Sequence, residues 1–255
     1  MLSIAPVPAF MDNYIWVIRN SQHAAAVDPG DAAPLLSYLE SENLDLVAIL
    51  NTHHHDDHVG GNLDLKARFG CRIYGPLRED IPGITHRLKG GDTVLIPELD
   101  LTFDVMDIPG HTLGHIAYYG QNMLFCGDTL FGCGCGRVFE GTMAQMHASL
   151  DKLASLPADT RVFCAHEYTQ SNIRFARAVE PENKVLEKRE AQALELRKKN
   201  LPTLPSTIGL EKATNPFLRG DILEVAHCAE HHAGQKLADE NAVFEVLRIW
   251  KNGYK

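Results

Sequence analysis

Short apolar runs separated by polar turns fill the first two thirds of the chain. Tyr14–Ile18, Ala24–Val27 and Leu46–Leu50 have the length and residue types of buried strands. Apolar residues at helical spacing predict helices over residues 59–69 and from a cap at Thr142 to Leu153. We expect further strands over residues 71–74, 101–108, 116–119, 123–126 and 161–164. The pattern predicts an α/β fold.

The pattern changes after residue 168. Four amphipathic or heavily charged segments predict helices over residues 172–180, 185–200, 221–232 and 241–251. An irregular connector with two prolines, Leu201–Ser206, separates the second helix from the third. We therefore expect two domains, a β-rich body over residues 1–168 and a helical domain over residues 169–255.

Composition excludes several classes of protein. The 255 residues carry a formal net charge of −9, which argues against general nucleic-acid affinity. No apolar run approaches a membrane span, and the N-terminal residues lack the basic region of a signal peptide. The six cysteines form no C-x-x-C pair, so we expect reduced thiols and a cytoplasmic protein. Cys133 and Cys135 are candidate metal ligands, although small residues of a glycine loop explain them better.

Polar side chains crowd into the segment that follows the predicted strand Leu46–Leu50. Residues 53–58 read His-His-His-Asp-Asp-His, and a helix is expected to follow. In an extended segment alternate side chains share a face, so His53, His55 and Asp57 should point one way and His54 the other. His58 can turn back beside Asp57 as the helix begins. Imidazole and carboxylate groups suit zinc, iron or manganese, so we interpret the segment as a metal site and not as a solvated polar loop.

Other polar residues also lie just past predicted strands. Asp28, His111, Asp128 and His166 each occupy such a position. One residue of this kind is more often a turn or cap residue, but several arranged alike are better explained by convergence on one site. For Asp28, a turn residue and a carboxylate that orients a ligand imidazole are equally compatible with the sequence.

These segments resemble a known family. Thr-His-His-His-Asp-Asp-His at 52–58 is similar to the THxHxDH signature of the metallo-β-lactamase superfamily. Gly134-Cys135-Gly136-Arg137 and the terminal Arg248-x-x-Lys251 are similar to elements of the glyoxalase II (hydroxyacylglutathione hydrolase) family, and the resemblance covers essentially the whole chain. It implies an αββα metallo-β-lactamase-type sandwich with a C-terminal helical domain, in which residues 1–168 are catalytic and residues 169–255 bind substrate.

The resemblance also implies two divalent metal ions per chain, most readily zinc, with iron or manganese as alternatives. It assigns His53, His55 and His111 to one ion, Asp57, His58 and His166 to the other, and Asp128 to both. His115 is either near the site or a buried structural histidine, and the resemblance favours the structural role.

The implied reaction is hydrolysis of S-(2-hydroxyacyl)glutathione thioesters, such as S-D-lactoylglutathione, to D-lactate and glutathione. Two ions lower the pKa of a shared water from about 15.7 toward about 7, which gives a hydroxide nucleophile at neutral pH. A thiol with a pKa of about 8.5 leaves without a strong general acid. Asp57 and Asp128 are the residues implied in catalysis. No Gly-x-Ser-x-Gly elbow or P-loop points to a serine hydrolase or a nucleotide enzyme.

Glutathione carries two carboxylates, so an acidic chain must present local cations to hold it. The resemblance nominates Arg137, Arg248 and Lys251, with Tyr168 as a hydroxyl donor. Phe139 stands where some members of the family have a tyrosine. We expect the chain to act as a monomer. The alternatives are another enzyme of the superfamily, such as a glutathione persulfide dioxygenase with a single iron, and a metal-dependent binding module without turnover.

Overall fold

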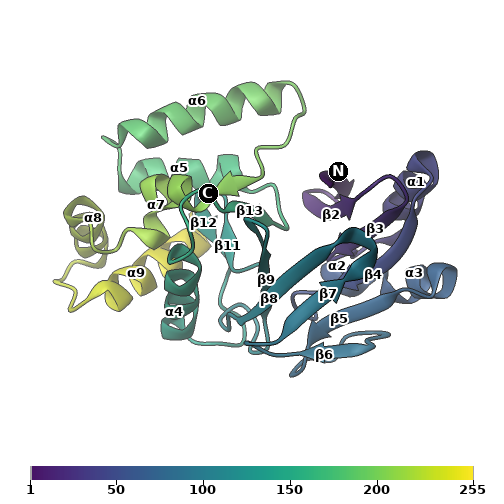
Figure 1. The fold of residues 1–255 in the computed structure, drawn as a ribbon. Coiled ribbons are helices and arrows are strands. Elements are labelled where there is room, and N and C mark those ends of the chain that lie inside the picture. Colours follow the sequence, from purple (N-terminus) through teal and green to yellow (C-terminus); the bar gives the residue numbers. More distant parts are fainter. Residues whose placement is uncertain (1, 255) are drawn as a thin grey trace. The chain divides into compact units, whose positions relative to one another are not determined.

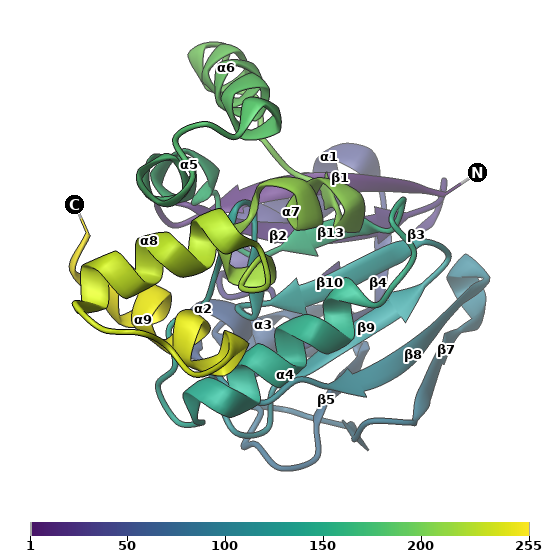
Figure 2. The same cartoon turned by 90° about the vertical axis from the view of Figure 1, so that its left-hand side faces the viewer.

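A computed structural model describes residues 2–254 of the chain. Its contacts divide the chain into two compact units. Unit 1 holds the residues up to Asp107 together with Leu113–Gly127, and unit 2 holds Ile108–Thr112 and the residues from Asp128 onward. Figures 1 and 2 show the elements of both units.

A six-stranded mixed sheet forms the first layer of unit 1, in the order β1-β2-β3-β4-β5-β6. Helices α1 and α3 cover one of its faces, and their apolar side chains join those of the strands in one buried cluster (Figure 1). The pairs β3–β4 and β4–β5 are parallel, so the chain leaves β4 at the carboxyl edge of the sheet. The elements are β1 (Ser3–Ala9), β2 (Asn13–Arg19), β3 (His23–Val27), α1 (Ala32–Glu42), β4 (Asp45–Leu50), α2 (Asp56–Val59), α3 (Asn62–Phe69), β5 (Arg72–Pro76) and β6 (His86–Leu88).

Four antiparallel strands form the second sheet of unit 1, in the order β10-β9-β8-β7. Buried Tyr118 of this sheet donates a hydrogen bond to the carbonyl of Asn51, directly after β4 (2.8 Å). This bond ties the second sheet to the loop that carries the histidine segment. The strands are β7 (Thr93–Ile96), β8 (Leu101–Asp107), β9 (Ile116–Gly120) and β10 (Met123–Gly127), with a 3₁₀ turn, η1 (Pro97–Leu99), between β7 and β8.

Two of the differences between unit 1 and the sequence prediction have a clear physical reason. β1 was not predicted, because Pro6 and Pro8 weaken its strand pattern; the strand lies at a sheet edge, where proline is tolerated. The predicted helix over residues 59–69 is interrupted at Gly60–Gly61, so that α2 and α3 are separate helices. The interruption lets the segment 53–58 enter a helical turn of its own.

Unit 2 combines two short strand pairs with six helices among the residues described. The β11–β12 hairpin is held by helix α7, because the buried Glu211 carboxylate accepts the backbone N–H of Cys133 (2.8 Å) and pairs with buried Arg189 (2.5 Å). Figure 2 shows α8 beside α9. The elements are β11 (Leu130–Phe131), β12 (Gly134–Cys135), α4 (Met143–Ala154), β13 (Arg161–Cys164), α5 (Thr169–Val179), α6 (Lys184–Lys198), β14 (Ser206–Thr207), α7 (Ile208–Thr214), η2 (Pro216–Leu218), α8 (Leu223–Ala233) and α9 (Glu240–Gly253).

Several predictions for this part of the chain are confirmed. Thr142 caps α4 in a reciprocal capping box with Gln145. Four of the C-terminal helices lie where expected, whereas α7 falls in a stretch where no helix was predicted. The contacts group residues 128–168 with these helices, so the compact units divide the chain elsewhere than at residue 168. Across residues 2–254, the helices are too short or too polar to cross a membrane.

Candidate metal centre and its pocket

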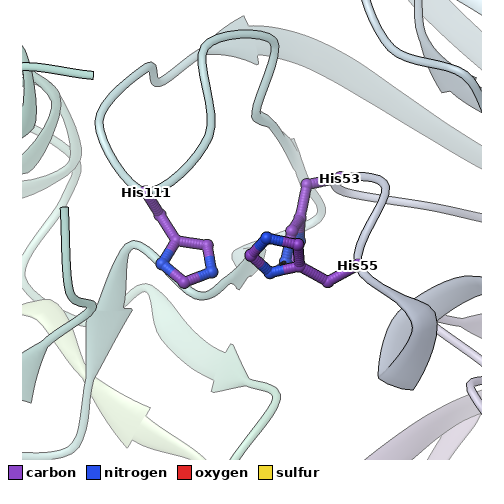
Figure 3. A group of neighbouring side chains, drawn as sticks. All are labelled: His53, His55 and His111. Atoms are coloured by element: carbon purple, nitrogen blue, oxygen red, sulfur yellow. Dashed lines mark hydrogen bonds between the residues drawn. The ribbon is translucent and has the colours of Figure 1, made fainter. Parts of the chain in front are cut away.

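The loop from β4 into α2 carries the histidine segment of unit 1. His53 and His58 are completely buried. The Nε2 atom of His53 lies 3.1 Å from the Nδ1 atom of His55, and the two rings are drawn in Figure 3. The Nε2 atom of His58 lies 3.5 Å from an Asp57 carboxylate oxygen. The predicted facing of His53 and His55 and the return of His58 beside Asp57 are therefore confirmed.

Asp28 and Thr52 fix the orientation of two of these imidazoles. One Asp28 oxygen accepts the backbone N–H of Thr52 (2.8 Å); the other accepts the Thr52 hydroxyl (2.8 Å) and lies 3.1 Å from the Nδ1 atom of His58. The Thr52 hydroxyl lies in turn 3.0 Å from the Nδ1 atom of His53. Both Nδ1 atoms thus face acceptors, which leaves the Nε2 lone pairs for a ligand. Of the two roles open for Asp28, the contacts favour the orienting carboxylate.

Asp57 is held by a residue that sequence reasoning missed. Asn13, at the start of β2, donates to an Asp57 carboxylate oxygen (3.0 Å). The backbone of Gly30 packs directly on the same turn, since a Cβ at Gly30 would lie 1.9 Å from the Asp57 carbonyl oxygen. Only glycine permits this approach. The pairing of residues 44 positions apart left no signal in the sequence.

Three candidate ligands lie together in unit 2. One Asp128 oxygen lies 3.4 Å from the Nε2 atom of His111, and the other lies 3.3 Å from the Nε2 atom of His166. These side chains come from the loop after β8, the residue after β10 and the loop after β13. Each carboxylate oxygen faces a different imidazole, which is the arrangement a bridging carboxylate needs.

The His111 tautomer follows from its hydrogen bond. Its Nδ1 atom lies 2.7 Å from the carbonyl oxygen of Arg137. A carbonyl only accepts, so Nδ1 carries a proton, and Nε2 is the ring nitrogen that faces Asp128. Gly136 makes this close approach possible, because a Cβ there would lie 1.8 Å from the Asp128 carbonyl oxygen and 3.4 Å from His111 Nδ1. Figure 3 labels the His111 ring.

The four donor-atom pairs have the spacing that a shared ion requires. Two nitrogen or oxygen ligands at 2.0–2.1 Å from a tetrahedral ion lie about 3.3 Å apart. The pairs within the units measure 3.1, 3.5, 3.4 and 3.3 Å. Imidazole nitrogens and carboxylate oxygens are also the donors that zinc, iron and manganese accept. The residues therefore fit divalent metal ions.

Three polar residues near the candidate ligands make other contacts. His54 turns to buried Glu79, whose carboxylate lies 3.1 Å from His54 Nδ1 and accepts the backbone N–H of Gly114 (2.9 Å). Asp56 is exposed. His115 is fully buried and stacks on His53 with ring centroids 4.6 Å apart, so it supports a candidate ligand by packing.

A cavity of about 440 Å³ lies within unit 2. Its wall includes the candidate metal ligands His111 and Asp128. It also includes all four residues nominated for substrate binding, Arg137, Tyr168, Arg248 and Lys251. Tyr168 stacks on the ligand candidate His166, with ring centroids 4.7 Å apart and planes 4° from parallel.

The pocket is electropositive at its Lys251 end. Desolvation lowers the pKa of Lys251, and the nearby guanidinium groups of Arg248, Arg174 and Arg137 lower it further. Lys251 also contacts the hydroxyl of Ser171 at 3.5 Å. A cation whose charged form is disfavoured in this way gains by binding an anion. Arg174, on α5, joins this group although its sequence context gave no indication.

Comparison with known proteins identifies the chain's relatives. The model of the metallo-beta-lactamase superfamily matches residues 10–166, and that of the hydroxyacylglutathione hydrolase C-terminus matches residues 167–254. A hydroxyacylglutathione hydrolase of Nitrosomonas eutropha is 57% identical over the full length of both chains. That of Thiobacillus denitrificans is 51% identical over 99% of this chain and 98% of the relative.

Solved structures agree with the fold. The BLEG-1 B3 metallo-beta-lactamase covers 86% of this chain and 100% of its own, with a TM-score of 0.63 and 26% identity. A protein crystallised in a di-iron-bound form covers 85% of this chain and 100% of its own, with a TM-score of 0.60 and 26% identity. The predicted metallo-β-lactamase-type fold with a C-terminal helical part is confirmed. The chain belongs to the hydroxyacylglutathione hydrolase family of the metallo-beta-lactamase superfamily.

Proposed function

We propose that the chain hydrolyses hydroxyacylglutathione thioesters, with S-D-lactoylglutathione as the substrate and D-lactate and glutathione as the products. The observation that carries the proposal is the unit 2 pocket, which combines candidate metal ligands with a group of cations. A thioester carbonyl and an anionic carrier need these two features side by side. Relatives named for this activity match the chain over its full length.

The proposed metal ligands are the seven residues that the family resemblance assigns. One ion would be held by His53, His55 and His111, and the other by Asp57, His58 and His166, with Asp128 shared. The spacing of the four donor pairs supports this set, as does the di-iron form of a structural relative. We propose zinc as the metal, with iron and manganese as alternatives. When bound, two such ions supply an activated water and positive charge for a developing oxyanion.

The chain's own residues then hold and move protons. Asn13 donates a hydrogen bond to an Asp57 oxygen and so fixes the orientation of this carboxylate. The remaining lone pairs of Asp57 can then accept a proton from water. His111 keeps its proton on Nδ1, because the Arg137 carbonyl accepts it there. The departing thiol has a pKa of about 8.5 and leaves as a thiolate without an acid. The site therefore needs no separate triad.

We propose that Arg137, Arg248, Lys251 and the Tyr168 hydroxyl hold the glutathione part of the substrate. Charge-assisted hydrogen bonds to carboxylates contribute roughly 1.5–3 kcal/mol each. These contacts would form on the carrier and not on the reacting carbonyl, so they act equally on the ground and transition states. Removing the Lys251 contact, which involves no other proposed role, is expected to raise KM and leave kcat nearly unchanged.

We also propose that the protein acts as a monomer in the cytoplasm. All six cysteines lie within residues 2–254 and are free thiols there, and burial raises the pKa of the Cys133 thiol to about 12. Inert buried thiols suit a reducing compartment.

One assay tests the proposed function. Purified protein, with its metal content measured on the same sample, is expected to hydrolyse S-D-lactoylglutathione without consuming oxygen. The glutathione persulfide dioxygenase considered above would instead consume oxygen and need one iron. The match of residues 167–254 to the hydrolase C-terminus favours the hydrolase. A metal-loaded protein without thioesterase activity would contradict the proposal.

A further inference from the structure

Arg248 of helix α9 is a buried arginine with 4% of its surface exposed. Its Nη1 group donates to the carbonyl oxygen of Cys135 at 2.7 Å and approaches that of Gly136 at 3.4 Å. Its Nη2 group donates to the Asn252 side chain at 3.1 Å, and its guanidinium lies over the Phe217 ring. Most of its N–H donors therefore already face acceptors within the protein, mainly the carbonyls of Cys135 and Gly136.

That segment, residues 135–137, contacts two candidate metal ligands on its other side. The carbonyl of Arg137 accepts the Nδ1 proton of His111 at 2.7 Å. Gly136 packs against the backbone of Asp128 so closely that a Cβ would lie 1.8 Å from the Asp128 carbonyl oxygen. The Gly136 N–H also donates to the carbonyl of Thr129 (3.1 Å). A shift of this segment must therefore move His111 and Asp128.

We propose that Arg248 is a positioning residue for the metal centre, which acts by clamping residues 135–137 against His111 and Asp128. The inference extends the proposed function, since Arg248 then does more than hold the substrate. Removing the guanidinium leaves two buried carbonyls without their charged donor and frees the segment to move. The imidazole of His111 then loses its fixed direction, as happens when the outer partner of a metal ligand is removed.

Lys251 provides the internal comparison. It lies one helical turn further along α9 and lines the same pocket, but its contacts are with Ser171 and the Phe175 ring. A change at Lys251 leaves the clamp on residues 135–137 in place. Two cations on one helix face are therefore expected to give different kinetic and metal-binding phenotypes.

The test uses full-length Arg248→Ala, Arg248→Lys, Lys251→Ala and Arg219→Ala proteins. Metal-free samples are titrated with Zn²⁺, and kcat and KM are measured after loading. The ring N–H signals of histidine are followed by NMR in the metal-free proteins. Arg219 controls for general destabilisation, because its bonds are a bidentate ion pair with Glu180 (2.8 and 2.9 Å) and a contact with the Lys212 carbonyl, and none of them is to residues 135–137.

Arg248→Ala is expected to lower Zn²⁺ affinity roughly 10-fold or more, as loss of an outer partner does. It should also reduce kcat and speed proton exchange of the His111 Nδ1–H signal. Arg248→Lys, which can still donate to one carbonyl, should recover part of each loss. Lys251→Ala should raise KM and keep Zn²⁺ affinity, and Arg219→Ala should keep both the affinity and the His111 signal.

The positioning role is overturned if Arg248→Ala raises only KM, with parental Zn²⁺ affinity and His111 exchange. It is also overturned if Arg219→Ala and Arg248→Ala lose the same amount of Zn²⁺ affinity for the same loss of stability, because the effect would then be general destabilisation. Should Arg248→Ala fail to fold, the comparison of Arg248→Lys with the parent decides by the same measures. The titration and the NMR signal need no substrate, so they remain decisive even if the parent does not hydrolyse the thioester.

Discussion

The two units hold their candidate ligands by different means. Unit 1 gathers four ligands on one short segment, and side chains from neighbouring strands and loops orient them, chiefly Asp28 and Asn13. Unit 2 gathers three ligands from three distant segments, and a backbone carbonyl, that of Arg137, orients His111. Unit 1 thus carries its candidate ligands on one compact segment. In unit 2, His111 and Asp128 line the cavity that Arg248 of helix α9 also lines, and Arg248 contacts the segment whose carbonyl faces His111.

The largest effect is expected at Asp128 of unit 2, the carboxylate that we propose both ions share. Asp128→Ala removes the oxygens that face both His111 and His166. The loss should exceed the 10–100-fold fall in metal affinity that follows removal of an outer partner. Elemental analysis should find fewer than two ions per chain, with turnover near background. Asp221→Ala, at an exposed carboxylate of the same unit, is the matched control. Two retained ions and normal turnover in Asp128→Ala would contradict the bridging role.

Asp28→Asn tests the corresponding support in unit 1. The amide can still accept the Thr52 N–H, but it no longer offers a carboxylate to both the Thr52 hydroxyl and His58 Nδ1. Metal affinity should fall roughly 10–100-fold, with KM for the thioester little changed. Competition with a chromogenic chelator measures the affinity. An unaltered affinity would reduce Asp28 to a turn residue.

Lys251→Met tests the pocket of unit 2 apart from its metal ligands. Loss of one charge-assisted contact should raise KM roughly 10-fold at constant kcat. The difference from the parent should shrink at high salt, where screening weakens the parent's affinity. A small thioester without glutathione carboxylates should be turned over equally by both proteins. A parental KM for S-D-lactoylglutathione would place Lys251 outside the binding site.

Lys251→Met should also stabilise the folded protein, although it weakens substrate binding. Folding lowers the pKa of Lys251 through desolvation and three neighbouring guanidiniums, so its charged form destabilises the folded state below that pKa. Lys251→Met should therefore be more stable than the parent at neutral pH. The advantage should shrink as pH rises through the lowered folded-state pKa and disappear above about 10.5, where the lysine is neutral in both states. Urea unfolding at pH 7 and pH 11 measures the difference.

His54→Ala should have the smallest effect on chemistry. His54 lies within the histidine segment but its Nδ1 atom pairs with Glu79, while its ring meets that of His55 edge-on with centroids 5.1 Å apart. Metal content and kcat should stay at the parental level, and stability should fall by less than about 1 kcal/mol because His54 is partly exposed. Metal analysis of the variant checks this expectation. Loss of an ion would place His54 among the ligands.

Sequence alone indicated the candidate metal chemistry of unit 1, because its candidate ligands lie within six residues and alternation in an extended segment decides which share a face. It also predicted most strands and helices, because burial of one face gives a helix and a strand different spacings of apolar residues along the chain. The seven ligands as a set came from resemblance to a family and not from spacing.

Only the tertiary structure decided how the ligands are oriented and what Arg248 contacts. Asn13 meets Asp57, and Arg248 meets Cys135, across 44 and 113 positions of sequence. Arg248 and Lys251 are three residues apart, which predicted that they share a helix face, and both line one pocket. This spacing could not predict that Arg248 is buried on backbone carbonyls while Lys251 is not. Hydrogen bonds to a backbone carbonyl carry no residue-type signal, so such contacts become visible only once the chain is folded.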